Sequence, residues 1–140
     1  LMPAILATGC VSAPSIVDAR VSRTTLFDNQ SAVLSVTVND KDGLEDIVGA
    51  HLFTGDQGFW FGSLYEVSDG VFETVVDWPT LNEQQPIYFD FPVVRELLVV
   101  VEDNHGEVDE VRFTLTLSCR AGDHACDGVC YPIDLACEDV

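Results

Sequence analysis

The sequence predicts an all-β protein: an immunoglobulin-like antiparallel β-sandwich followed by a disulfide-rich C-terminal tail. Apolar and polar residues alternate with a period of two along much of the chain, which is typical of strands with one buried face. Turn-forming residues interrupt this alternation about every ten residues. No stretch of more than two helical turns shows convincing helical periodicity. About eight short strands over roughly a hundred residues are the pattern of a β-sandwich of immunoglobulin size.

Two segments show the alternation most clearly, residues 32–39 and residues 110–117. The expected strands are residues 16–21, 32–39, 46–53, 59–65, 71–78, 87–91, 96–102 and 110–117. The core is expected to contain Leu34, Val36, Val38, Phe72, Val76, Phe113 and Leu115, with Arg112, Thr114 and Thr116 outside. A register slip of one residue would invert both sets together.

The breaks between these strands contain residues that favour turns, such as Asp42-Gly43, Asp69-Gly70 and Trp78-Pro79. The last strand runs into the cysteine-rich tail near Ser118. The sequence therefore predicts three parts. They are an apolar N-terminal segment (1–13), a sandwich domain (14–118) and a tail (119–140).

The charge of the chain makes one class of function improbable. Its 140 residues include 24 acidic and 6 basic side chains, for a formal net charge of −18, and Lys41 is the only lysine. Such a charge repels the phosphates of nucleic acids, so binding to DNA or RNA is not expected. The acidic side chains indicate either a well-hydrated surface or, where they cluster, a site for calcium.

The tail carries four of the five cysteines, in the pattern Cys119-x6-Cys126-x3-Cys130-x6-Cys137. So many cysteines with little apolar material between them predict two disulfides and an oxidising, extracellular location. Three connectivities are possible, and we favour Cys119–Cys130 with Cys126–Cys137, because interleaved bonds best fix a segment without a core. The alternative is a zinc site that includes His124.

The remaining cysteine, Cys10, should not pair with the tail. It is expected to be lipidated, free or bonded to another chain, since an odd cysteine in an exported protein needs such an explanation. The run from Leu6 to Cys10 resembles a lipobox, although Ala7 stands where leucine is usual. The protein would then be secreted or an outer-membrane lipoprotein, reaching the membrane only through this anchor. Alternatively, the apolar N-terminal segment adds as a strand to a second copy and builds a fibre.

The segment Asp40-x-Asp42-Gly43-x-x-Asp46 places three carboxylates within seven residues. Calcium needs six to eight hard oxygen ligands, and a second acidic loop with Asp103 would supply another if the two strand ends share one edge. The expected calcium ligands are therefore Asp40, Asp42, Asp46 and Asp103. The alternative is an ordinary hairpin turn at Asp42-Gly43.

The aromatic run Phe59-Trp60-Phe61 invites a carbohydrate-stacking or protein-binding interpretation. In a strand Phe59 and Phe61 share one face, which we assign to the core, while Trp60 faces solvent as the candidate binding residue. No nucleophile elbow or other catalytic constellation is recognisable, so a non-enzymatic role is expected.

The loop at residues 39–46 resembles a strand-end loop of bacterial immunoglobulin-like domains, and so does the strand at residues 97–102 that leads into the loop at residues 103–106. Those domains are similar to modules on surface lipoproteins and adhesins of Gram-negative bacteria. The resemblance covers residues 14–118 and implies a sandwich without catalysis, which recognises a protein or cell-surface partner or serves as structure. The tail around Cys126-Asp127-Gly128-Val129-Cys130 resembles low-density-lipoprotein-receptor class A modules, but it has four cysteines rather than six, so that family's calcium site is not carried over.

Overall fold

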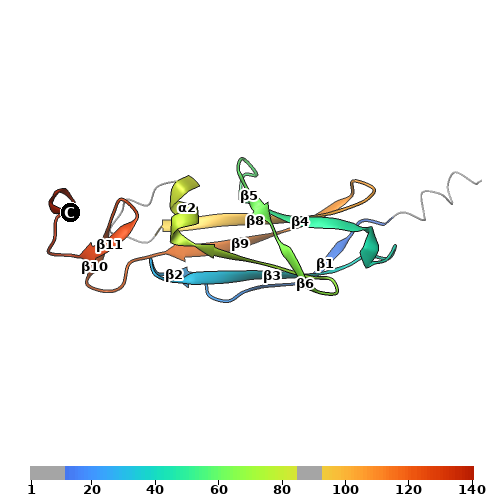
Figure 1. Cartoon of the computed structure of the whole chain (residues 1–140), viewed down its shortest axis with the longest axis horizontal. Helices are drawn as coiled ribbons and strands as arrows, with labels where there is room; N and C mark the ends of the chain where they lie inside the picture. The colour runs from blue at the N-terminus through green and yellow to red at the C-terminus, as the bar shows by residue number, and fades with distance from the viewer. Residues whose placement is uncertain (1–11, 85–92) are drawn as a thin grey trace, which may run out of the picture. The chain divides into compact units, whose positions relative to one another are not determined.

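The computed structural model describes residues 12–84 and 93–140. Within these residues the chain forms a β-sandwich, as the sequence predicts (Figure 1). The first sheet contains, in spatial order, β1 (Ser15–Val21), β3 (Ser31–Asn39), β7 (Val71–Asp77) and β6 (Tyr65–Ser68). The second contains β2 (Thr25–Leu26), β9 (Val108–Leu117), β8 (Val93–Asp103), β4 (Ile47–Thr54) and β5 (Trp60–Ser63). Pairing is antiparallel between β4 and its neighbours and parallel between the short β2 and β9.

The core follows the predicted phase of the alternation. Leu34, Val36, Val38, Phe72, Val76, Phe113 and Leu115 are all buried. Arg112 and Thr114 are exposed, and Thr116 is half-buried. The period of two therefore identified the inward face correctly, because each strand presents one face to the other sheet.

One expected strand differs from the structure, and another lies outside the described residues. The expected strand at 59–65 is two strands, β5 and β6, which belong to different sheets. The chain changes sheet at Leu64, whose side chain is buried and whose amide donates to the Ala50 carbonyl at 2.8 Å. The expected strand at 87–91 falls in the part of the chain that the structure does not describe.

Where a turn was expected at Trp78-Pro79, the chain forms the helix α2 (Trp78–Gln84). The Asp77 carboxylate caps it by accepting hydrogen bonds from the Thr80 amide at 3.1 Å and the Thr80 hydroxyl at 2.8 Å. A proline in the first turn of a helix removes no intrahelical hydrogen bond, so Pro79 is tolerated there. The helix is anchored by the buried indole of Trp78, whose Nε1 donates to the Leu26 carbonyl at 2.8 Å.

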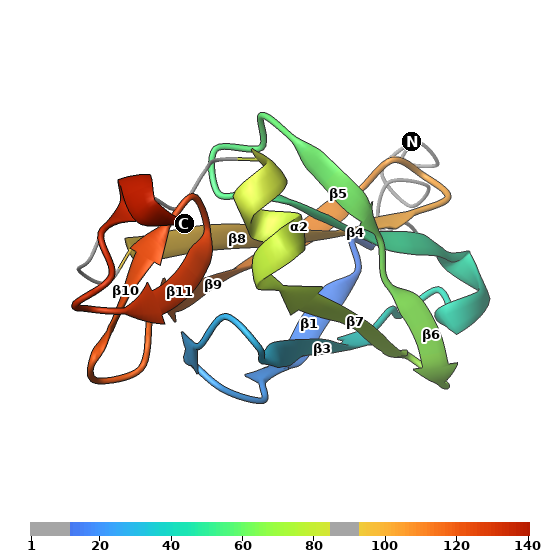
Figure 2. The same cartoon turned by 60° about the vertical axis from the view of Figure 1, so that its left-hand side comes forward.

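The chain divides into two compact units. Among the described residues, the first comprises residues 12–20, Ser35–Thr74 and Leu97–Phe113, and the second comprises Val21–Leu34, residues 75–84 and 93–96, and Thr114–Val140. In the first unit β4 and β8 lie side by side (Figure 2), with Ile47 at the start of β4 paired to Asp103 at the end of β8. The domain boundaries predicted at residues 13 and 118 remain a prediction.

The tail belongs to the second unit and is built on a hairpin of β10 (Asp123–Cys126) and β11 (Val129–Pro132). The two loop residues, Asp127 and Gly128, have φ of 54° and 81°, as a type I′ turn requires. Disulfides join Cys119 to Cys130 and Cys126 to Cys137, which is the interleaved pairing favoured from the sequence. The short 3-10 helix η2 (Cys137–Asp139) follows.

Candidate functional site

The loop after β3 crosses from one sheet to the other, because β3 belongs to the first sheet and β4 to the second. The connection at Asp42-Gly43 is therefore not a hairpin, whereas a turn does form there. The crossover opens with a turn in which the Gly43 amide donates to the Asp40 carbonyl at 3.0 Å. Gly43 has a φ of 98°, which residues with a side chain rarely adopt. The 3-10 helix η1 (Leu44–Asp46) completes the crossover.

This crossover and the β8–β9 turn bring together three aspartates, Asp40, Asp46 and Asp103, which we call the carboxylate cluster. Asp40 follows β3, Asp46 ends η1 and Asp103 ends β8. Their carboxylate oxygens lie within 4.8 Å of one another. The pairing of Ile47 with Asp103 explains the approach, and the Asn104 amide, which donates to the Asp46 carbonyl at 2.8 Å, reinforces it. The sequence analysis made the contribution of Asp103 depend on whether the loop with Asp40 and the loop with Asp103 lie at the same edge of the sandwich. In the structure these two loops do meet.

The cluster is buried, and its hydrogen bonds occupy one side of the carboxylates only. The exposed fractions of Asp40, Asp46 and Asp103 are 6%, 7% and 1%. The Oδ1 of Asp103 accepts hydrogen bonds from the amides of His105 and Glu107, both at 2.9 Å. The Oδ2 atoms of all three aspartates are buried and have no hydrogen-bond partner among the described residues. Three neighbouring carboxylates thus each hold a buried acceptor without a donor.

Asp42, the fourth predicted ligand, does not join the cluster. It lies instead in a second group with His105 and Asp46, again within 4.8 Å, and Asp46 is common to both groups. The Oδ2 of Asp42 accepts a hydrogen bond from the Ser12 amide at 3.1 Å. The Nδ1 of His105 lies 3.4 Å from the Oδ1 of Asp46, a contact that the sequence analysis missed. The signal for it was the Asn104-His105-Gly106 turn directly after Asp103, which brings the next side chains back toward the strand end.

Burial and the repulsion between like charges make it unfavourable for the carboxylate cluster to be ionised without a cation. Burial raises the pKa of Asp40 above its ordinary value, and the hydrogen bond from the Asp42 amide opposes that shift. The neighbouring carboxylates of Asp46, Asp42 and Asp103 raise the Asp40 pKa further. At an effective dielectric constant near 20, two unit charges about 4 Å apart repel by about 4 kcal/mol. An approaching cation would therefore be attracted strongly.

The tail histidine does not form a zinc site in this structure. His124 is buried, and its Nε2 lies 2.6 Å from the Leu135 carbonyl oxygen. Its cysteine neighbours, Cys126 and Cys137, are bonded to each other. Zinc binds thiolates, and a disulfide offers none.

A second candidate surface lies on β4 and β5, where Trp60 is 56% exposed, as predicted. A bulge between Leu52 and Phe53 shifts the register so that Trp60 pairs with Phe53. On the same face His51 pairs with Ser63, and their side chains are hydrogen-bonded at 3.0 Å. We call His51, Phe53, Trp60 and Ser63 the β4–β5 surface. The outward position of His51 and Phe53 was readable from their alternation with buried Ala50 and Leu52.

The assignment of Phe59 to the core is wrong, because this side chain is 43% exposed. It lies before β5, in the turn that Thr54 and Asp56 hold, and so it is outside the pleat that would bury it. Phe61 is half-buried, and its ring meets that of Phe59 edge-on with centroids 5.1 Å apart. The two rings therefore share a side, as expected, but that side is not the core.

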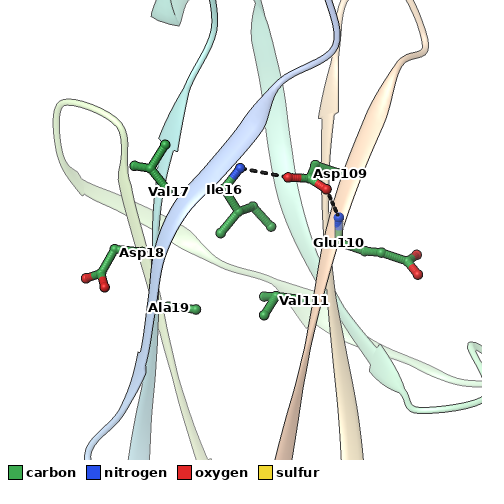
Figure 3. A pocket seen from close by; sticks show the side chains of 7 residues that line it. All are labelled: Ile16, Val17, Asp18, Ala19, Asp109, Glu110 and Val111. Carbon is green, nitrogen blue, oxygen red and sulfur yellow. Dashed lines mark hydrogen bonds between the residues drawn. The ribbon is translucent and has the colours of Figure 1, made fainter.

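An open groove of about 350 Å³ lies between β1 and the outer edge of β9 (Figure 3). Ile16, Ala19 and Val111 give it an apolar floor, and acidic residues including Asp109 line it. The Ile16 amide donates to the Asp109 carboxylate at 2.8 Å. Along β9, pairing with β2 involves only Thr116 and Leu117, so within the described residues the rest of this edge has no strand partner.

Of the comparisons with known proteins, the one with carbohydrate-binding modules, at a TM-score of 0.52, supports the fold. No family model matches the chain, and no curated protein matches it. The PKD1 domain of Vibrio anguillarum Epp aligns with 78% of this chain and 98% of its own, at 13% identity and a TM-score of 0.46. A structure of carbohydrate-binding modules from the β-sandwich superfamily aligns over 80% of this chain and 37% of its own, at 18% identity and a TM-score of 0.52. This chain therefore spans well under half of the second structure, and the likeness concerns the fold alone.

Two further observations bear on where the protein works. The two disulfides indicate an oxidising compartment. Among the described residues, no helix is both long and apolar enough to cross a membrane. Cys10, the predicted site of lipid attachment or intermolecular bonding, lies outside the described residues.

Proposed function

We propose that this chain is a non-enzymatic recognition module of the extracellular space or cell surface, and that it binds neutral carbohydrate through the β4–β5 surface. The observation that carries this proposal is Trp60, a large aromatic side chain that is 56% exposed on an edge strand. Exposed aromatic side chains beside polar groups are typical of binding surfaces. Here the hydrogen-bonded pair of His51 and Ser63 supplies the polar groups.

The fold and the charge agree with this ligand class. The similar β-sandwich structure named above is of carbohydrate-binding modules, so the architecture is compatible with such a role. The net charge of −18 disfavours acidic glycans, as it does nucleic acids. A neutral sugar meets no such repulsion, and a protein partner with a basic surface is the other class that the surface would accept.

Affinity electrophoresis against a soluble β-glucan, a xylan and a mannan tests the ligand class. We expect one of these polysaccharides to retard the wild-type protein, and Trp60→Ala to weaken binding at least about tenfold, or about 1.4 kcal/mol. Tyr65→Ala is the matched control, since Tyr65 is 74% exposed but lies on the other sheet. No retardation by any of the three, or equal losses in both variants, would contradict the proposal.

A fibre subunit is the second candidate, and the groove along β9 favours it. A strand from a second copy would find unpaired backbone groups and an apolar floor there. The occupant would be the uncharged segment 1–11 of that copy. Mass photometry of the full chain should then show multimers, and deletion of residues 1–9 should abolish them. Multimers that persist after the deletion would exclude this route of assembly.

A lipid anchor on Cys10 is compatible with the recognition role, but a chain that begins at Cys10 lacks residues 1–9 and so lacks most of the segment that the fibre requires. Intact mass spectrometry of the natively produced protein should show a chain that begins at a diacylated Cys10. An unmodified Cys10 within a longer chain would remove the anchor from the proposal.

A further inference from the structure

We propose that the carboxylate cluster of Asp40, Asp46 and Asp103 binds one calcium ion, which ties the crossover between the two sheets to the β8–β9 turn. This site is separate from the β4–β5 surface, and the inference does not depend on what that surface binds. Its ligands come from three places in the sequence, so the ion would act as a cross-link.

The first argument is that the Oδ2 atoms of the three aspartates are buried without a hydrogen-bond partner among the described residues. Buried polar atoms in native proteins nearly always have a partner, and a buried charge without one is strongly unfavourable. Here the Oδ2 atoms of three side chains that are 1–7% exposed have no donor, and one carboxylate oxygen of each of these side chains lies within 4.8 Å of the other two. A single hydrogen-bond donor would satisfy one or two of them, whereas a cation between them satisfies all three.

The second argument is that the ligands are already held in place. Backbone amides fix the Oδ1 atoms of Asp40, at 2.8 Å, and of Asp103, at 2.9 Å. His105 lies 3.4 Å from the Oδ1 of Asp46. The first oxygen of each carboxylate is therefore engaged, and the second oxygen is left available to an ion. Binding to ligands that are already ordered avoids most of the entropy cost of arranging them.

The third argument is the match to calcium among the common metal ions. The ligand set is oxygen only, which suits hard cations and disfavours zinc or copper. Calcium–oxygen distances of about 2.3–2.6 Å allow ligands on opposite sides of the ion to lie up to about 5 Å apart, which covers the span of this cluster. Magnesium requires distances of about 2.0–2.1 Å in a near-octahedral arrangement and gives up its water reluctantly. Calcium accepts an irregular arrangement of ligands completed by water, which suits carboxylates that come from a crossover loop and from the end of a strand.

Isothermal titration calorimetry tests the inference, with the disulfide-intact full chain stripped by chelator and titrated with CaCl2 in 150 mM NaCl. We expect one site per chain for the wild type and at least about a tenfold loss of affinity in Asp103→Asn. This variant keeps the shape of the side chain and an oxygen acceptor for both amides. Asp134→Asn, an exposed residue of the tail, is the control with the same change of charge. We expect it to bind calcium as the wild type does.

Thermal melting supplies the second readout. With calcium at about a hundred times the dissociation constant, the wild-type midpoint should rise by roughly 5–10 °C, and that of Asp40→Asn should rise by much less. If Asp103→Asn does not fold, as judged by circular dichroism, Asp40→Asn replaces it in the titration. Absence of binding by the wild type, equal binding by the cluster variants, or magnesium binding as tight as calcium would each overturn the assignment.

Discussion

The carboxylate cluster and the C-terminal tail solve the same problem by different means. The cluster consists of charged side chains, and the tail has little apolar material between its cysteines, so neither is held together mainly by apolar burial. The tail joins its segments with two covalent bonds, and its hairpin is closed by a turn whose residues suit the backbone. The cluster brings three carboxylates together and leaves three of their oxygens without a donor. The cross-links of the tail are thus complete within the chain, whereas the ion that we propose for the cluster would have to come from outside.

The largest effect that separates the two regions should come from the tail. The double replacement Cys126→Ser with Cys137→Ser removes the disulfide that closes this loop of the tail. A disulfide that closes a loop of similar length stabilises a protein by about 3 kcal/mol. We expect the free energy of unfolding to fall by about that amount, as measured by urea denaturation followed by fluorescence. Calcium affinity should not change. A parallel loss of calcium binding would show that the two regions are coupled.

The second-largest predicted effect is that of Asp40→Asn on the free energy of unfolding, and its sign differs between chelator and saturating calcium. In the presence of chelator, Asp40→Asn removes one of three like charges from a buried site, so it should stabilise the protein, on the order of 1 kcal/mol. In saturating calcium the same substitution removes a ligand and should leave the variant less stable than the wild type. Urea denaturation under both conditions measures the two differences. The same sign under both would mean that the cluster does not act as a metal site.

The smallest predicted effect concerns Asp56, a carboxylate that, unlike those of the cluster, has its hydrogen-bond donors within the chain. Hydrogen bonds from the Thr54 hydroxyl, at 2.6 Å, and then from the Gly58 amide lower the pKa of Asp56. A folded-state pKa below the unfolded value stabilises the protein above the unfolded pKa, and this contribution is lost as the pH falls through the folded value. Thr54→Val should therefore weaken the decline of stability below about pH 4.

Thermal melting between pH 2.5 and 7 measures this dependence, with Asp134→Asn as a control from a different loop. An acid limb that is identical in Thr54→Val and the wild type would show that the turn does not contribute.

The fold class was predictable because the alternation of residues such as Phe113 and Leu115 with Arg112 and Thr114 depends only on the pleat of a strand. The elements that escaped prediction are those fixed by local capping or by the partner strand. The helix α2 depends on Asp77 as its cap, in a segment too short for helical periodicity to show. The division of residues 59–65 into two strands depends on the change of sheet at Leu64.

The candidate site was predictable in part for a related reason. Asp40 and Asp46 are close in sequence, and Asp103 was inferred from the expectation that two strand ends share an edge. Which of the four acids point inward was not predictable, since that depends on the turn at Gly43 and on the Ser12 amide that engages Asp42. Phe59 escaped prediction because its exposure depends on where β5 begins.

The position of Lys41 has a practical consequence for the whole molecule. It is the only lysine of the chain, it is exposed, and it lies in the crossover that joins the sheets. A lysine-specific protease therefore has one peptide bond to cut, and the cut separates β1 and β3 from all later strands. Both disulfides lie beyond residue 118, so neither rejoins the pieces. A single nick converts the sandwich into two fragments that must hold together by strand pairing and core contacts alone.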